Sequence, residues 1–95
     1  MPVTPPESKL AWKPWPEAGE DAVRLDRLDF DPKRVVSATV KRNADNRWEW
    51  AVWVGGRLIG KGDHHRPGRA FTEASTGWII GTLLIERLGL ERRAA

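Results

Sequence analysis

Residues 47–74 read RWEWAVWVGGRLIGKGDHHRPGRAFTEA, and this stretch decides the fold class. Its first eight residues alternate between two sets of side chains with a period of two, as a half-buried strand does. Gly55 and Gly56 follow, and glycine readily takes the positive φ angles of a tight hairpin turn. Further on, Ala70 and Ala74 are four residues apart and share one face of a helix. The stretch therefore predicts a tryptophan-rich β-hairpin that leads into one long helix.

A two-residue turn determines which residues of the hairpin face each other. Val52 is expected opposite Ile59, and Trp50 opposite Lys61. Cross-strand partners share a face of the sheet, so one face is predicted to be apolar and to receive the helix. That face holds Trp48, Trp50, Val52, Val54 and Ile59. The opposite face holds mainly small residues around Trp53, and is predicted to be available to the N-terminal arm or to a ligand.

The complete chain predicts an α+β domain in the order α-β-β-β-α. Three antiparallel strands are expected, at 34–42, 47–54 and 57–62. Residues 17–28 are predicted to form a short helix, because Pro16 and several acidic residues suit a first helical turn. Partial alternation in residues 23–30 leaves a strand open as the alternative. The long helix is expected at 67–88, packed on the sheet, and the residues predicted to be largely buried are Trp50, Val52, Ile59, Ala74, Trp78 and Leu84.

Three segments make up the predicted organisation of the chain. Residues 1–16 contain five prolines and are predicted to form an extended arm. Residues 17–90 form the α+β domain, and residues 91–95 a short basic tail. Trp12 and Trp15 lie in the arm, where two solvated indoles would leave much apolar surface in water. We expect them to cover apolar surface, either on the domain itself or on a partner.

The hairpin and the helix start resemble the double-stranded RNA-binding domain over about 30 residues. The match needs no gap and covers that family's strand aromatics and aliphatics, its turn glycine, its strand-exit glycine and its helix alanines. The matching residues here are Trp48, Trp50, Val52, Val54, Gly56, Ile59, Gly62, Ala70 and Ala74. The resemblance implies a helix, three antiparallel strands and a helix. The family's basic cluster at the second helix falls on Pro67, Gly68, Ala70 and Phe71, and its histidine loop on residues 43–46. The resemblance therefore implies the fold, but not the RNA-binding residues.

Composition and charge limit the class of protein. At 95 residues the chain is expected to form one domain with little room for a deep catalytic cavity. It has no cysteine and no recognisable signal peptide or membrane span, so we expect a cytoplasmic protein that is not bound to a membrane. Residues 1–32 carry four basic and seven acidic residues, net −3, whereas residues 33–95 carry twelve and six, net +6. This asymmetry suits a polyanionic partner or a charge match within the domain.

A basic cluster precedes the long helix and continues into its first turn. It consists of Lys61, His64, His65, Arg66 and Arg69. Free backbone N–H groups and the helix dipole favour an anion at such a position, so a phosphate could bind there. Four basic residues at the strand ends would extend the patch: Lys41, Arg42, Arg47 and Arg57. Trp53 would offer a stacking surface beside them. The alternative is a turn whose basic side chains are simply solvated.

No motif for metal binding or catalysis is present. Asp63, His64 and His65 are consecutive, so they point to different sides of an extended chain, and no further ligand follows at helical spacing. Ser8, Ser37 and Ser75 lack the sequence context of an activated nucleophile. We expect no metal, no cofactor and no enzymatic activity.

Six tryptophans in 95 residues are stronger evidence for a protein partner than a net charge of +3 is for a nucleic acid. Tryptophan is enriched at interface hot spots, and residues 78–85 are apolar on nearly every side of a helix. We therefore predict a protein-interaction module, an adaptor or an inhibitor of the kind that phages and mobile elements encode. A homodimer is expected through the long helix, with Ile79 or Leu83 at its centre. The alternative is a nucleic-acid-binding module that uses the basic cluster.

Overall fold

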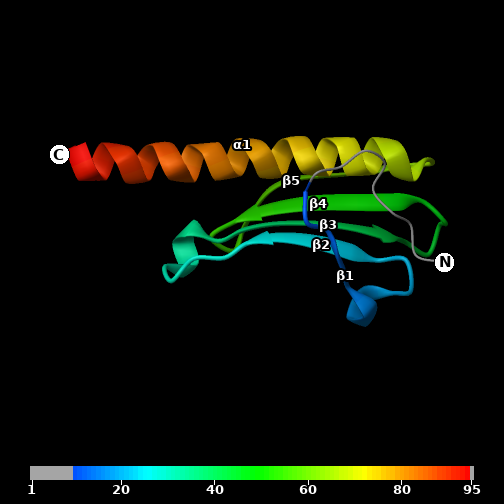
Figure 1. Ribbon diagram of the computed structural model, residues 1–95. Coiled ribbons are helices and arrows are strands. Elements are labelled where there is room, and N and C mark those ends of the chain that lie inside the picture. The colour runs from blue at the N-terminus through cyan, green and yellow to red at the C-terminus, as the bar shows by residue number, and fades with distance from the viewer. Residues whose placement is uncertain (1–9, 95) are drawn as a thin grey trace.

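The computed structural model describes residues 10–94, and the side chains of residues 10–87. Five antiparallel strands form one sheet in the order β1-β2-β3-β4-β5, and a single helix, α1, lies across one face of it (Figure 1). The elements are β1 (Lys13–Pro14), the 3₁₀ turn η1 (Pro16–Ala18), β2 (Val23–Arg27), the 3₁₀ turn η2 (Pro32–Arg34), β3 (Val36–Arg42), β4 (Trp48–Val54), β5 (Arg57–His64) and α1 (Pro67–Ala94).

The predicted helix at 17–28 is wrong, and with it the α-β-β-β-α order with three strands. Only one 3₁₀ turn forms after Trp15, and it ends at Gly19, whose φ is 141°. The chain then enters β2, where Val23 and Leu25 lie opposite Val40 and Ala38 of β3 and are buried. The alternation in this segment therefore outweighed the helix-start signals, because it places two large aliphatic side chains in the core.

Part of the predicted arm also belongs to the sheet. Lys13 and Pro14 form β1 and pair with Arg24 and Val23 of β2. In Figure 1, β1 takes the chain past the edge of the sheet, from the helix side to the opposite side. Residues 1–9 of the arm, with Ser8, lie outside the described residues.

The other predicted elements lie close to the observed ones. The strands expected at 34–42, 47–54 and 57–62 correspond to β3, β4 and β5, and the helix begins at Pro67 as expected but continues to Ala94. Gly55 and Gly56 have φ angles of 59° and 80°, which confirms the predicted turn. Among the residues expected to be buried, Val52 and Ala74 are fully buried, Trp50 and Trp78 are half-buried, and Ile59 and Leu84 are exposed.

A β-bulge in β5 changes the predicted hairpin register. Val52 pairs with Gly60 and Trp50 pairs with Gly62, so Ile59 has no direct partner and Lys61 lies opposite Ala51. An ideal Cβ on Gly62 would lie 2.7 Å from Nε1 of Trp50, so only glycine leaves room for the indole there. The bulge places two glycines beneath Trp50 and moves Ile59 out of the core.

The core lies between α1 and strands β2 to β4. Val36, Val40 and Val52 are its largest completely buried side chains, and each contributes roughly 1.5 to 3 kcal/mol by leaving water. Phe71 extends the core from the helix side, and the Trp78 indole N–H donates to the carbonyl oxygen of Val36 at 3.2 Å. Among the described residues no α-helix lies on the opposite face of the sheet, on which side Figure 1 shows the 3₁₀ turn η1.

Asp26 on this open face predicts a measurable dependence of stability on acid. Burial raises the pKa of Asp26, but hydrogen bonds from Arg24 (2.8 and 2.9 Å) and Ser37 (2.7 Å) outweigh it, and the net pKa is below 3.8. Its contribution to stability is complete above pH 3.8 and is lost as the pH falls through the lower folded-state pKa. We expect Asp26→Asn to lose less stability on acidification, in urea unfolding at a series of pH values, than the parent. Asp45→Asn, in an exposed turn, is the control, and an equal acid dependence in parent and Asp26→Asn would contradict the prediction.

Candidate functional site

The basic cluster predicted before the helix is divided among different surroundings. His64 lies on the helix side of the sheet, where its Nε2 is 2.8 Å from Oε2 of Glu73. This contact is the main reason why the pKa of Glu73 is lowered from 4.5. Lys61 lies opposite Ala51 and so shares the open face of the sheet with it. The structure therefore does not bring Lys61 and His64 together.

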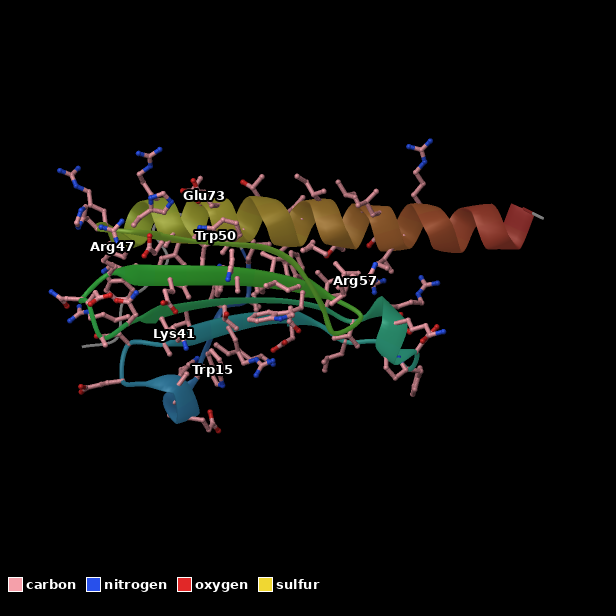
Figure 2. All side chains as sticks on the ribbon, turned by 180° about the vertical axis from the view of Figure 1, so that it is seen from behind. Trp15, Lys41, Arg47, Trp50, Arg57 and Glu73 are labelled. Carbon is pink, nitrogen blue, oxygen red and sulfur yellow. The ribbon has the colours of Figure 1, made fainter. Side chains whose placement is uncertain are left out.

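The remaining members of the cluster are interleaved with an acid. Arg47, labelled in Figure 2, contacts His65 at 2.9 Å and Asp63 at 3.2 Å, so this part of the turn is a mixed network. Arg66 and Arg69 are exposed. Two carboxylates, of Asp63 and Glu73, therefore lie within the region where a phosphate was expected, and like charge opposes an anion there.

Four of the six tryptophans pack on the helix side of the sheet. Trp12 meets Phe71 edge to face at 5.2 Å between ring centroids, so this arm residue covers the domain itself. Trp48 is buried, Trp50 lies over the bulge glycines, and Trp78 packs against the core. Tryptophan content alone therefore overstates the interaction surface, because most of these indoles build the core.

Trp15 and Trp53 lie on the open face instead. Trp15 follows β1 and its ring is 5.5 Å from the guanidinium of Arg24. Trp53 pairs with Ser37 of β3 across the sheet. Both indoles line the same two hollows of about 530 and 570 Å³ on this face. These are the two sequence-predicted aromatic candidates that remain available to a ligand.

The outer face of α1 carries the largest group of exposed aliphatic side chains on one element. Its members are 42 to 58% exposed: Ile79, Ile80, Leu83 and Leu84. Thr72 and Thr76 continue this face toward the start of the helix, and their hydroxyls donate to helix carbonyls at 2.9 and 2.8 Å. Those hydroxyls therefore need no further partner. We call this surface, from Thr72 to Leu84, the outer face of α1.

The helix is also longer than the sheet that supports it. Its 28 residues span about 42 Å, whereas the seven residues of β4 span about 23 Å. In Figure 1 the C-terminal part of α1 extends well beyond the strands. Leu84 was predicted to be buried, and it is exposed because the helix turns this side away from the sheet. Sequence reasoning identified Ile79 and Leu83 but missed Ile80 and Leu84, whose exposure depends on the exact rotation of the helix.

The described residues contain no group of three histidine, cysteine, aspartate or glutamate side chains that could hold a metal ion. Ser37 donates its hydroxyl to Asp26 on the sheet face. No helix in the part of the chain that the structure describes is both long and apolar enough to cross a membrane.

Comparisons with protein-family models, with curated proteins and with solved structures found no match, so the resemblance to the double-stranded RNA-binding domain stays a prediction.

Proposed function

We propose that this protein is a non-enzymatic interaction module that pairs with a second copy of itself through the outer face of α1. The observation that carries the proposal is the exposure of Ile79, Ile80, Leu83 and Leu84 on one helix face. An uncharged face of this kind, on a helix that extends past its own sheet, gains stability when another surface covers it.

The spacing of residues along α1 favours a second helix as the occupant. Residues 73, 76, 80, 83 and 87 follow the alternating three- and four-residue spacing of a coiled-coil seam. Ile80 and Leu83 are at its centre, and Glu73 and Arg87 are at its two ends. A parallel pair would place like charges together at each end. An antiparallel pair brings Glu73 of one copy, whose carboxylate also contacts His64 of its own sheet at 2.8 Å, to the Arg87 end of the other, so we propose the antiparallel arrangement.

The energetics predict a weak dimer. Covering a half-exposed leucine or isoleucine contributes about 1 kcal/mol, and a pair of copies covers eight such side chains, about 8 kcal/mol in all. Association itself costs at least about 4 kcal/mol, which leaves a net gain of at most about 4 kcal/mol and a dissociation constant of about 1 mM. The result is a concentration-dependent equilibrium, with roughly 1,000 Å² buried in total.

Leu83→Glu tests this proposal directly. A glutamate at the centre of the seam would bury a charge without a partner, so we expect the variant to be monomeric and folded at concentrations where the parent dimerises. Sedimentation equilibrium over a range of concentrations measures the change, and circular dichroism checks the fold.

Leu58→Glu is the matched control. Leu58 is 45% exposed, close to the 58% of Leu83, but it pairs with Trp53 on the other face of the sheet. This variant should dimerise like the parent. A parent that stays monomeric up to about 1 mM, or a Leu83→Glu protein that still dimerises, would show that the proposal is wrong.

A further inference from the structure

A row of five residues, three of them basic, crosses the open face of the sheet perpendicular to the strands. Strand pairing places five residues side by side, one from each strand: Lys13, Arg24, Thr39, Ala51 and Lys61. Cations stand at the β1–β2 side and at the β5 edge, and the two residues between them are small. We call this set the basic row.

Two indoles lie on opposite sides of the basic row. Trp15 follows Lys13 by two residues on the β1 side, and Trp53 follows Ala51 by two residues on β4 in the other direction. Both line each of the two hollows, together with Thr39. The hollows therefore have aromatic walls and, at Thr39, a small side chain from β3. This geometry accepts flat apolar groups that project from an extended chain.

The charge of this face favours an anionic ligand. Two of its acids are neutralised, because Asp26 pairs with Arg24 and Asp63 pairs with Arg47. Glu49 keeps its charge, since its hydrogen-bond partner at 2.9 Å is the neutral amide of Asn43, and it lies opposite Lys41 in the strand pairing. Lys41 and Lys61 form no ion pair with any described residue. Both line the larger hollow, together with the carboxylates of Glu49 and Asp63. With Asp63 paired to Arg47, the two lysines exceed Glu49 by one positive charge beside the indoles.

We infer that the open face binds single-stranded nucleic acid. Bases stack on Trp53 and Trp15, and Lys41 and Lys61 contact the phosphates that lie between the bases. An aromatic surface with neighbouring cations is the arrangement that holds unpaired bases without reading their sequence. A duplex keeps its bases stacked inside and could not offer their flat faces to the two indoles.

This site differs from the one expected at the start of α1. The open face lies on the other side of the sheet from the helix, as Lys41 and Trp15 show in Figure 2. The two locations can therefore be separated by matched substitutions that change the net charge equally.

Fluorescence anisotropy with a labelled oligothymidylate of about 12 nucleotides tests the inference. We expect the parent to bind it at about 50 mM salt, and more weakly at about 200 mM. Trp53→Ala should weaken binding about tenfold, because one stacking surface is removed. Lys41→Glu with Lys61→Glu should weaken it further and reduce the salt dependence by about 0.7 for each phosphate that is no longer neutralised. If Trp53→Ala does not fold, the double lysine variant still tests the inference, because Lys61 is exposed.

Arg66→Glu with Arg69→Glu is the control, since it makes the same change in net charge at the start of α1. It should reduce binding much less than the lysine pair. Equal losses in the two double variants would mean that net charge alone drives binding, and a greater loss in the arginine pair would place the site at the helix. Either result would overturn the inference, as would a parent that does not bind at low salt or that prefers a duplex of the same length.

Discussion

Gly55→Ala should lower the free energy of unfolding by about 3 kcal/mol, a large share of what a small domain has. Gly55 has a φ of 59°, which costs a residue with a Cβ roughly 1 to 2 kcal/mol. An ideal Cβ there would also lie 2.7 Å from the carbonyl oxygen of Lys33 and 3.0 Å from its Cα. These are backbone atoms of η2, and they cannot move without displacing the turn. Urea unfolding of parent and variant measures the loss.

Gly56→Ala is the control within the same turn. Gly56 has a φ of 80°, but nothing lies within 4 Å of an added Cβ. Only the backbone strain applies, so the loss should be about 1 kcal/mol. Equal losses at the two positions would show that the hairpin turn does not pack on η2, contrary to the 2.8 Å hydrogen bond from the Gly55 N–H to the carbonyl oxygen of Val35.

The same turn shows what could be predicted from the sequence. A Gly-Gly pair between alternating strands is a local signal, and it predicted the position of the hairpin turn correctly. The helix was predicted from the residues after the hairpin, and it does begin at Pro67. That Gly55, and not Gly56, packs against η2 depends on a contact between segments about twenty residues apart. Spacing within one segment contains no information on such a contact.

The missed strand β2 has a related cause. Pro16, Glu17 and Glu20 favour the first turn of a helix, and a 3₁₀ turn does form at Pro16–Ala18. Whether it continues is decided by β3, whose Ala38 and Val40 offer Leu25 and Val23 a place in the core. Local propensity is weak compared with this burial, so the strand forms.

The candidate site was predicted only in part. Trp15 and Trp53 could be identified because the alternation separates the faces of β4 and because prolines keep the arm extended. The strength of the basic cluster was overestimated, because Asp63 pairs with Arg47 only when β4 and β5 are paired, and Glu73 contacts His64 only when β5 is placed against α1. The basic row was missed entirely, since it joins one residue from each of five strands and depends on the bulge at Ile59.

The two proposed sites lie on opposite sides of the molecule. The outer face of α1 points away from the sheet, and the basic row lies on the sheet face that α1 does not cover. Figure 1 shows α1 on one side of the sheet. A dimer formed through α1 would therefore leave both open faces accessible. Leu83→Glu should then remove self-association without reducing the affinity of each copy for a short single strand. The two proposals can therefore be tested independently.

Gly77→Leu should lower the free energy of unfolding by about 3 kcal/mol. It should not affect dimerisation, which we assign to the outer face of α1. An ideal Cβ at Gly77 would lie 2.9 Å from Cγ2 of Val52, a completely buried side chain with little rotational freedom. Gly81 is similar, with Cγ2 of Val54 at 3.0 Å. The two glycines thus let the helix approach its own sheet rather than a second copy of the chain.

Gly68→Leu provides the matched comparison for this prediction. Gly68 lies in the first turn of the same helix and has nothing within 4 Å of an added Cβ. Replacing it removes the conformational cost of glycine in a helix and should raise stability by up to about 1 kcal/mol. The same substitution is thus expected to have opposite signs nine residues apart on α1. Urea unfolding of both variants decides the matter, because a Gly77→Leu protein as stable as the parent would mean that α1 does not rest on Val52.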